Sequence, residues 1–498
     1  MKLQNILGIS AGFHDAAACV IDTRGDILYA SSSERYSKQK NDANLHHKMF
    51  WDIAPGACHI DHIAYYERPW MKQLRRLRSG EGIDWSGLST RSVVTQQLQG
   101  YFSHLPITCY NHHLSHAAGG FQTSPFDRAT VVVIDAIGEF DTVTIWGAEY
   151  QHGRAKYTQL WRQGYPHSIG LFYSAITDRV GLHPMDEEYI TMGMSAYGKN
   201  KDSLALYMEG KLVEDLKEIR FQDNLHAGVA PDFMWDSEPE DIAGAAQSLV
   251  EDLIYAVMER ARAFNWSPNL VYQGGVALNC LANRNLGDWF DRVWIMPAPG
   301  DAGSSLGAAA LAYGGRVNWQ NAFLGHEIPG PYPVEELITA LIQDKIVGVA
   351  SGRAEFGPRA LGNRSLLADP RGAEIKDKVN EIKRRQKFRP FAPVVLEEHA
   401  DQYFDFSDSF CDTRYMQVVG RCRHPDLYPA ITHVDGTSRI QTVPADGSGI
   451  RSLLEAWYAR TGCPMLLNTS LNIRGEPMVN DRADADRFEQ LYGVKVCS

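Results

Sequence analysis

The apolar run Thr130-Val-Val-Val-Ile134 ends in the acidic, glycine-containing turn Asp135-Ala-Ile-Gly-Glu-Phe140, and this stretch decides the fold. Two more apolar runs follow, over residues 142–149 and 156–161, with a turn between them. Short apolar runs bounded by turn residues predict strands joined as hairpins. The same series stands at the start of the chain, in the runs 6–10, 16–22 and 27–31. Two copies of one strand–turn–hairpin series predict a duplicated sheet in an α/β protein.

Farther along, the chain shows where a second domain begins. Helical and extended patterns alternate between residues 241 and 313, as expected for an α/β domain. The next stretch, 316–334, is rich in glycine and proline and lacks periodicity, which predicts a linker. A buried strand at 346–350 then opens a new domain. We therefore predict one domain over residues 1–335 and another over 336–498.

The composition limits the classes of protein to consider. With 498 residues, 44% apolar and 22% charged, the chain predicts a globular protein of about two to four domains. No apolar run is long enough for a membrane span and no secretory signal is visible, so we expect a cytoplasmic protein with no membrane partner. The eight cysteines form no CxxC pair, which favours free thiols. A net charge of −11 predicts no overall positive field to attract nucleic acid.

Two histidines and two acids form a candidate metal site. His112 and His116 are four residues apart, so on a helix they share one face. This pair alone equally suits a helix with solvated or capped histidines. Asp135 ends an apolar strand, where a carboxylate is costly unless it is paired or metal-bound, and Asp301 lies in a glycine-rich turn. Two imidazoles and two carboxylates suit iron(II), manganese or zinc, and their chemistry does not choose among the three.

Glycine turns between strands and helices form a candidate nucleotide site. Backbone amides at such turns bind phosphate, because no Cβ blocks the approach. Any one glycine turn is commonly a matter of chain geometry alone. Several in one duplicated framework predict ATP, with Mg²⁺ accompanying the nucleotide, and the candidate residues are Gly12, Gly138, Gly274, Gly275, Asn279 and Gly303.

The C-terminal part of the chain has three loops dense in cations and in amide or hydroxyl donors. They span residues 352–365, 380–390 and 467–477. Guanidinium groups beside such donors can bind a small phosphorylated acyl group through paired hydrogen bonds. The middle loop alone would more often be a solvated charged face, but together the three predict an anion pocket.

Taken together, these motifs resemble the carbamoyltransferase family, which includes the O-carbamoyltransferases of antibiotic tailoring and nodulation-factor synthesis. The resemblance covers nearly the whole chain. The motifs that carry it are Ile9–Asp15, Glu34–Lys40, Asn111–Ala117, Gln273–Asn279, Pro299–Gly303, Phe356–Ser365, Phe388–Pro393 and Asn468–Asn472.

The resemblance implies a fold and a reaction. The fold is a duplicated actin-like ATPase domain, which is ribonuclease H-like, followed by a YrdC-like α/β domain. The reaction uses carbamoyl phosphate and ATP, forms carbamoyl-adenylate and carbamoylates an acceptor hydroxyl.

Residue roles carry over from the family by position. His112, His116, Asp135 and Asp301 match the family's metal ligands, and the metal implied is iron(II). His14 and Lys40 match polar positions near the nucleotide and acyl group, and we predict them to be the general base and a charge stabiliser. The carbamoyl-phosphate loops carry Arg359, Arg364, Ser365, Lys383, Arg389, Asn468, Ser470 and Asn472.

Neither the acceptor nor the oligomeric state follows from the sequence. A sugar or natural-product hydroxyl is the family default, but the family also contains viral enzymes that modify hydroxymethylcytosine in DNA. One helix face could meet phosphates, because its cations recur at helical spacing: Arg68, Lys72, Arg75 and Arg76. The simpler alternative is a solvated helix. Two rival functions are a threonylcarbamoyl-type enzyme acting on tRNA and a non-catalytic actin-like ATPase module.

Overall fold

The computed structural model describes residues 5–56, 59–78 and 82–498. The chain forms two compact units, which are Met1–Ser33 with Asn41–Gln320, and Glu34–Lys40 with Asn321–Ser498. A short segment from the N-terminal part of the chain thus belongs to the second unit. The predicted functional division at residue 335 did not include this exchange.

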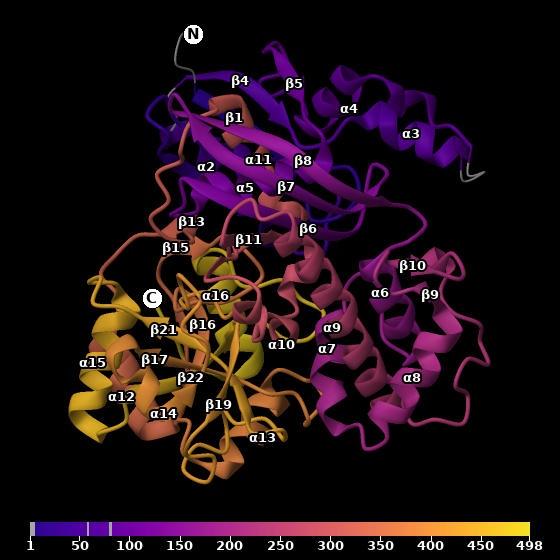
Figure 1. Ribbon diagram of the computed structural model, residues 1–498. Coiled ribbons are helices and arrows are strands. Elements are labelled where there is room, and N and C mark those ends of the chain that lie inside the picture. The colour runs from indigo at the N-terminus through magenta and orange to yellow at the C-terminus, as the bar shows by residue number, and fades with distance from the viewer. Residues whose placement is uncertain (1–4, 57–58, 79–81) are drawn as a thin grey trace. The chain divides into compact units, whose positions relative to one another are not determined.

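The first unit contains a five-stranded sheet in the order β3-β2-β1-β4-β5 (Figure 1). β1 and β2 are antiparallel, as are β2 and β3, whereas β1, β4 and β5 are parallel. The strands are β1 (Asn5–Ser10), β2 (Ala17–Ile21), β3 (Ile27–Ser32), β4 (Ile60–Tyr65) and β5 (Ile107–Cys109).

A second five-stranded sheet repeats this arrangement in the order β8-β7-β6-β11-β12. Again the first three strands are antiparallel neighbours and the last three run parallel. The strands are β6 (Arg128–Gly138), β7 (Asp141–Gln151), β8 (Arg154–Gly164), β11 (Asn269–Gln273) and β12 (Arg292–Trp294). The repeat confirms the predicted α/β class and the predicted duplication of the sheet.

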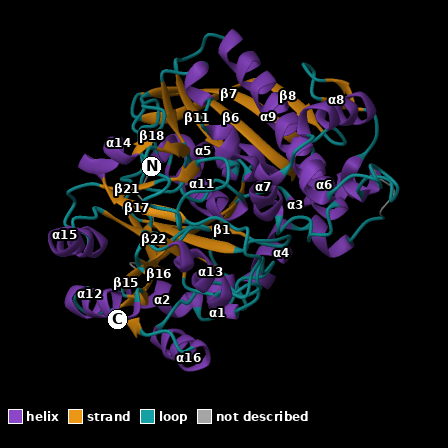
Figure 2. Ribbon diagram, turned by 90° about the horizontal axis from the view of Figure 1, so that it is seen from below, coloured by secondary structure: helices purple, strands orange, loops and turns teal. Residues whose placement is uncertain are grey.

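Two helices made largely of small residues lie between the sheets (Figure 2). α11 (Asp301–Tyr313) packs on β1 and β2, α5 (His112–Thr123) packs on β6 and β11, and the two helices contact each other. Their approach depends on glycine, since a Cβ on Gly307 would lie 1.8 Å from the carbonyl oxygen of Ser115. This close packing brings the first turns of both helices together.

The first unit contains further helices and a separate two-stranded sheet of β9 and β10. None of the helices within the described residues is both long and apolar enough to cross a membrane. The elements are α2 (Met49–Gly56), α3 (Pro69–Arg78), α4 (Thr90–Gln97), α6 (Ile169–Arg179), α7 (Glu188–Met194), α8 (Lys201–Leu212), β9 (Val213–Asp215), β10 (Arg220–Phe221), α9 (Pro239–Ala263) and α10 (Cys280–Asn283).

The second unit is also α/β, as predicted. Its six-stranded sheet has the order β21-β17-β22-β16-β14-β23. The strands are β14 (Ile346–Ala350), β16 (Arg364–Ala368), β17 (Ala392–Leu396), β21 (Gln441–Val443), β22 (Met465–Ser470) and β23 (Val496–Cys497). The helices are α1 (Glu34–Ser37), α12 (Val334–Asp344), α13 (Ala373–Ile382), α14 (Ala400–Tyr403), α15 (Gly449–Thr461) and α16 (Arg482–Tyr492). A small sheet joins β18 (Phe404–Asp405), β19 (Val419–Cys422) and β20 (Thr437–Arg439).

The predicted linker over 316–334 is wrong at its centre. β13 (Phe323–Ile328) lies there and pairs with β15 (Gly352–Glu355) in an antiparallel ladder. The pairing joins segments far apart in the sequence, so the local glycine and proline content did not reveal it.

Candidate active site

The candidate metal ligands lie where both sheets end and the buried helices begin. His112 begins α5 shortly after β5, and His116 follows one helical turn later on the same face. Asp135 lies in β6 and Asp301 begins α11. Parallel strands end at one edge of a sheet, and α/β proteins commonly place their sites there. The duplicated fold thus brings together residues that are far apart in the sequence.

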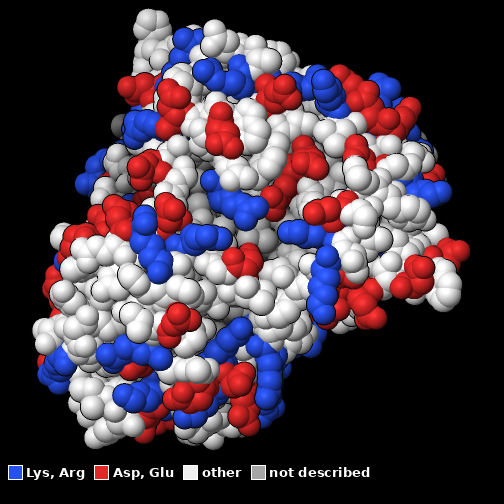
Figure 3. All heavy atoms as spheres, turned by 60° about the horizontal axis from the view of Figure 1, so that its bottom comes forward, with Lys and Arg blue, Asp and Glu red and all other residues white. Residues whose placement is uncertain are grey.

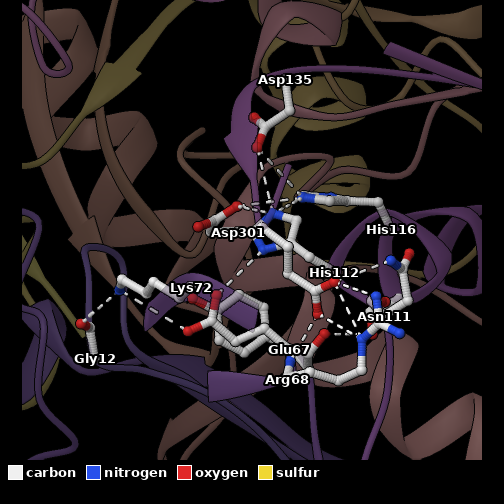
Figure 4. Close-up of polar contacts among 12 residues, drawn as sticks. Gly12, Glu67, Arg68, Lys72, Asn111, His112, His116, Asp135 and Asp301 are labelled. Atoms are coloured by element: carbon white, nitrogen blue, oxygen red, sulfur yellow. Dashed lines mark hydrogen bonds and ion pairs between the residues drawn. The ribbon is translucent and has the colours of Figure 1, made fainter. Parts of the chain in front are cut away.

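The ligand atoms of these four residues face one another (Figure 4). The Nε2 atoms of His112 and His116 are 3.1 Å apart, and each lies 3.2 Å from Oδ1 of Asp301. Oδ2 of Asp135 lies 3.3 Å from Nε2 of His112 and 3.9 Å from Nε2 of His116. All four residues are buried, and their ligand atoms lie within 4.8 Å of one another.

The electrostatics of the cluster favour a cation. Burial and the carboxylate of Asp301 act to raise the pKa of Asp135, but the hydrogen bond from His112 and the charge of His116 outweigh them and lower it. Burial acts to lower the pKa of His112, but Asp301 and Asp135 raise it well above its usual value. The site therefore keeps its carboxylates ionised and attracts positive charge. A divalent cation fits this donor set, because it can bind both carboxylates and both Nε2 atoms. Without it, protons on the two facing Nε2 atoms would repel each other.

Backbone contacts orient two of the ligands. Nδ1 of His116 lies 3.0 Å from the carbonyl oxygen of Pro299 and donates its proton there, which leaves the Nε2 lone pair for the cluster. Oδ1 of Asp135 accepts a hydrogen bond from the N–H of Gly275 at 3.1 Å, which leaves Oδ2 facing the imidazoles. Such outer contacts fix the tautomer and direction of metal ligands.

The start of α5 is held by a small polar network. The side chain of Asn111 caps the helix by accepting a hydrogen bond from the N–H of Leu114 at 2.9 Å. The same side chain donates to Oε2 of Glu139 at 3.2 Å, and the Nε of Arg68 donates to Oε1 of Glu139 at 3.0 Å. Glu139 thus ties α3 and β6 to the turn that carries His112.

Gly138, predicted to contact ATP, lies against the metal ligands. A Cβ at this position would lie 2.3 Å from Cδ2 of His112 and 2.7 Å from Cδ2 of His113. The structure therefore gives Gly138 a packing role beside the cluster, which the strand-end position alone did not reveal.

Replacing Gly138 with alanine is expected to push the His112 ring away from the cluster and weaken divalent-cation affinity by about 10- to 100-fold, the range for disturbed ligand orientation. Isothermal titration with Mn²⁺ measures this loss. The control is Gly210→Ala in α8, where a Cβ meets open space. Equal affinity for both variants would contradict this role of Gly138.

The other predicted nucleotide residues shape the turns around the cluster. Gly274 has a φ of +91°, and a Cβ there would lie 2.1 Å from the carbonyl oxygen of Ile134, so only glycine fits. A Cβ on Gly303 would lie 1.8 Å from the carbonyl oxygen of Ala298, and Gly12 has a φ of +97°. Asn279 differs, because its side chain caps α10 and exchanges two hydrogen bonds of 3.1 Å with Gln247. ATP binding by these residues stays a prediction.

His14, the predicted general base, lies beside the cluster. Its Nε2 is 3.9 Å from Oδ2 of Asp301, and its Nδ1 is 3.0 Å from Oδ2 of Asp15. Burial opposes protonation, but the hydrogen bond to Asp15 and the charge of Asp301 raise the pKa of His14 to about 9. In this state the imidazole is protonated at neutral pH and cannot accept a proton.

In the cation-free protein, His14 is expected to titrate near pH 9 instead of its ordinary value of 6.5. Because its folded-state pKa is raised, the stability it contributes is fully present below the ordinary pKa and is lost as the pH rises through about 9. Adding Zn²⁺ should lower this pKa, since like charges repel. Imidazole NMR titrations with and without Zn²⁺ measure the shift, and identical titrations would contradict the placement of His14 beside the cation.

A second candidate site surrounds Lys383 in the other unit. Its buried Nζ donates to the carbonyl and side-chain oxygens of Asn472, both at 2.9 Å, and to Oγ of Ser470 at 3.1 Å. Burial, then the charges of Arg385, Arg389 and Lys40, lower the pKa of Lys383 well below its usual value. In the residues described, Lys383 forms no contact with a carboxylate. Together with the carbonyl oxygen of Ser470, these oxygens engage all three N–H donors of Lys383, so anion binding by this amine stays a prediction.

Further polar side chains belong to the same sheet face. β16 and β22 pair Ser365 with Ser470, and Asn468 lies two residues before Ser470, so all three project to one side. Oγ of Ser365 and Oδ1 of Asn468 are buried and find no hydrogen-bond partner within the described ranges. Unsatisfied buried polar atoms suit a site that receives a polar ligand.

Arg364 has a different role from the one predicted. Its guanidinium donates to the carbonyl oxygens of Asn480, Ser351, Asn363, His326 and Gly352, at 2.8–3.2 Å. These bonds occupy all five N–H donors, so none remains for a phosphate. We reassign Arg364 from ligand binding to holding the surrounding loops. Arg359 and Arg389 are half-buried and remain candidates.

The predicted DNA-binding stripe on α3 is not free to bind phosphates. Arg68 is bound to Glu139, Arg75 is buried and Arg76 is half-buried. Lys72 lies near Glu67 and donates to the carbonyl oxygen of Gly12 at 3.3 Å. On the molecular face drawn in Figure 3, basic and acidic side chains are interspersed and form no continuous positive strip. These contacts remove the feature that favoured DNA.

Several buried acids escaped the sequence analysis. Oε1 of Glu355 accepts three hydrogen bonds, from the N–H groups of Leu361, Asn363 and Arg364 at 2.8–3.1 Å, and so shapes the loop before β16. Glu67 lies two residues after the end of β4. The same signal, an acid after an apolar strand, singled out Asp135 and could have found Glu67.

Comparison with known proteins gives a consistent relationship. Residues 88–310 match the family described as carbamoyltransferase N-terminus, and 338–496 match carbamoyltransferase C-terminus. The chain is 30% identical to a 3'-hydroxymethylcephem-O-carbamoyltransferase from Amycolatopsis lactamdurans, over 97% of this chain and 95% of that protein. It is 31% identical to nodulation protein NolO from Bradyrhizobium diazoefficiens, over 75% of each. Among solved structures, the alignment with HypF from T. kodakarensis covers 62% of this chain and 47% of HypF, with a TM-score of 0.38 and 13% identity.

Proposed function

The chain belongs to the carbamoyltransferase family, and from this premise we propose that it moves a carbamoyl group from carbamoyl phosphate, through carbamoyl-adenylate formed with ATP, to an acceptor hydroxyl. The observation that carries the proposal is the buried cluster of His112, His116, Asp135 and Asp301. Enclosing two carboxylates beside two imidazoles is costly unless they bind a cation. A non-catalytic ATPase module has no need of such a cluster.

The second unit supplies the donor site in this proposal. Lys383, held by Ser470 and Asn472, adds positive charge beside the phosphate, and nearby cations stabilise the negative charge that develops as the phosphate leaves. Lys40 lies in the segment that belongs to this unit, and its charge acts on Lys383. We therefore assign Lys40 to the donor anion. Ser365 and Asn468 offer polar contacts to the carbamoyl group, and Arg359 and Arg389 add positive charge.

The first unit supplies the transfer site. The glycine turns bind ATP with its Mg²⁺, and the four-ligand cluster binds a divalent metal, for which we propose iron(II). When bound, such a metal polarises a carbonyl or phosphoryl oxygen and stabilises developing charge. His14 then acts as the general base on the acceptor hydroxyl, because the positive charge at the cluster opposes protonation of its imidazole.

The acceptor in this proposal is the hydroxyl of a small molecule. The relative from Amycolatopsis lactamdurans is named for a hydroxymethyl acceptor, which is consistent with this class. Because Arg68 and Lys72 are bound to other groups of the protein, no specific observation favours DNA as the acceptor. A tRNA substrate likewise has no supporting surface among the described residues.

Mass spectrometry of candidate hydroxyl acceptors, after incubation with the protein, ATP and carbamoyl phosphate, tests the proposal. We expect a mass gain of one HNCO, which requires both ATP and carbamoyl phosphate. Without acceptor, pyrophosphate release should still depend on carbamoyl phosphate. If threonine with bicarbonate replaces carbamoyl phosphate and supports pyrophosphate release equally well, the threonylcarbamoyl alternative is correct and the proposal is wrong.

A further inference from the structure

The outer nitrogen of His112 distinguishes this ligand from its partner. Whereas Nδ1 of His116 donates to the carbonyl oxygen of Pro299 at 3.0 Å, Nδ1 of His112 is buried and has no hydrogen-bond partner in the described part of the chain. Oε2 of Glu67 lies 3.7 Å from it, just beyond hydrogen-bond reach. A modest movement of either side chain would close this gap.

Glu67 is in turn connected to the loop after β1. It is buried at the end of β4, and its Oε1 lies 3.9 Å from Nζ of Lys72 on α3 (Figure 4). The same Nζ donates to the carbonyl oxygen of Gly12 at 3.3 Å and lies 4.8 Å from the centre of the Phe13 ring. Lys72 thus connects the candidate nucleotide loop with Glu67, which faces the metal ligand.

These contacts have a defined chemical consequence. Lys72 places a positive charge 3.9 Å from Oε1 of Glu67. A side-chain oxygen that accepts a hydrogen bond from the Nδ1–H of a ligand histidine directs the Nε2 lone pair at the metal. His116 obtains the same orientation from a backbone carbonyl, but His112 has no such carbonyl partner.

We propose that Glu67 and Lys72 are positioning residues for the metal centre, with Glu67 accepting a hydrogen bond from the Nδ1–H of His112 and Lys72 holding Glu67 in place from the Gly12 loop. This inference rests on the proposed function only through the bound cation. It gives Lys72 a role inside the transfer site, in place of nucleic-acid contact.

Cobalt binding to the full-length protein tests the proposal without any turnover. Co²⁺ shifts the exchangeable ring protons of its histidine ligands in the NMR spectrum, so the wild type should show two such signals, one from each imidazole. In Glu67→Met, which removes the acceptor oxygens at similar side-chain length, we expect the His112 signal to broaden through faster exchange with water. The His116 signal, protected by Pro299, should persist and serves as an internal reference. Co²⁺ affinity should fall by about 10- to 100-fold, as for other outer-sphere partners.

Variants of α3 separate positioning from general effects of charge. Lys72→Met is expected to weaken Co²⁺ binding less than Glu67→Met does, and Lys72→Arg should retain wild-type binding. Arg78→Met removes an exposed cation from the same helix and should change nothing. The proposal is overturned if Glu67→Met leaves both signals unchanged, if it removes both, or if Arg78→Met matches Lys72→Met.

The cobalt experiment also separates this inference from the proposed function. A wild-type protein that shows both cobalt-shifted signals but carbamoylates no acceptor would reject the function and leave the positioning role intact. A wild-type protein that binds no Co²⁺ would reject the positioning role.

Discussion

Substituting Asp301 with asparagine is expected to abolish carbamoyl transfer, because it removes the carboxylate that both imidazoles face at 3.2 Å. Disturbing an outer partner of a metal ligand costs about 10- to 100-fold, so losing a ligand itself should weaken cation affinity by more than about 100-fold. The neutral amide also no longer raises the pKa of His112, so the buried cluster loses much of its attraction for positive charge. Metal content after dialysis and the rate of acceptor carbamoylation measure both effects.

Asp288→Asn is the matched control for this substitution. Asp288 is an exposed acid of the same unit, so its replacement should leave cation content and transfer unchanged. The thermal midpoint of each variant separates loss of the site from loss of the fold. An Asp301→Asn protein that retains the wild-type cation content and rate would show that the cluster is not a metal site.

Replacing Lys383 with methionine is expected to reduce carbamoyl-phosphate-dependent pyrophosphate release by about 100-fold or more, the usual cost of removing one charge-stabilising group. Burial and the neighbouring cations lower the pKa of Lys383, and a bound phosphate is expected to restore the charge of this amine. Cation binding in the first unit should not change. Pyrophosphate release in the absence of acceptor and Mn²⁺ titration measure the two expectations separately.

Two further variants test whether the loss is specific to Lys383. Lys378→Met removes an exposed cation from α13, the helix that ends just before Lys383, and should have no effect. Ser470→Ala removes one oxygen contact of Lys383 without burying an unpaired group, and should give a smaller loss in the same reaction. Equal rates for Lys378→Met and Lys383→Met would contradict the assignment of the donor site.

The duplicated sheet could be predicted because strand patterns and turns are encoded locally. Both copies of the series form strands close to the expected ranges, and the glycine turns follow them. Errors arose where strand pairing decides the element, because the pattern of one segment does not reveal its pairing partner. The expected turn from Asp135 continues as strand to Gly138, because Gly138 pairs with Asp141 across a tight connection. β13 was missed for the same reason, since its partner β15 lies beyond a helix and a strand.

The site was predictable to the extent that its residues stand in motifs. The four ligands of the cluster were named from their types and positions, and the structure brings them together. Side-chain partners were not predictable, because a sequence does not show which donors are already occupied. Arg364 carries the residue type of a phosphate ligand, yet backbone carbonyls take all its hydrogens. Lys72 carries the spacing of a surface stripe, yet it points to Gly12 and Glu67.

The exchange of Glu34–Lys40 into the second unit means that no single cut divides this polypeptide into two complete halves. Arg35 fills the interior of that unit and donates to the carbonyl oxygens of Glu355 and Gly357, both at 3.3 Å. A fragment starting at Asn321 lacks this arginine, so both carbonyl oxygens would have to bind water in its place. The fragment ending at Gln320 carries the segment Glu34–Lys40 without the unit to which it belongs. The two fragments, produced separately, should therefore associate when mixed, with Glu34–Lys40 completing the second unit.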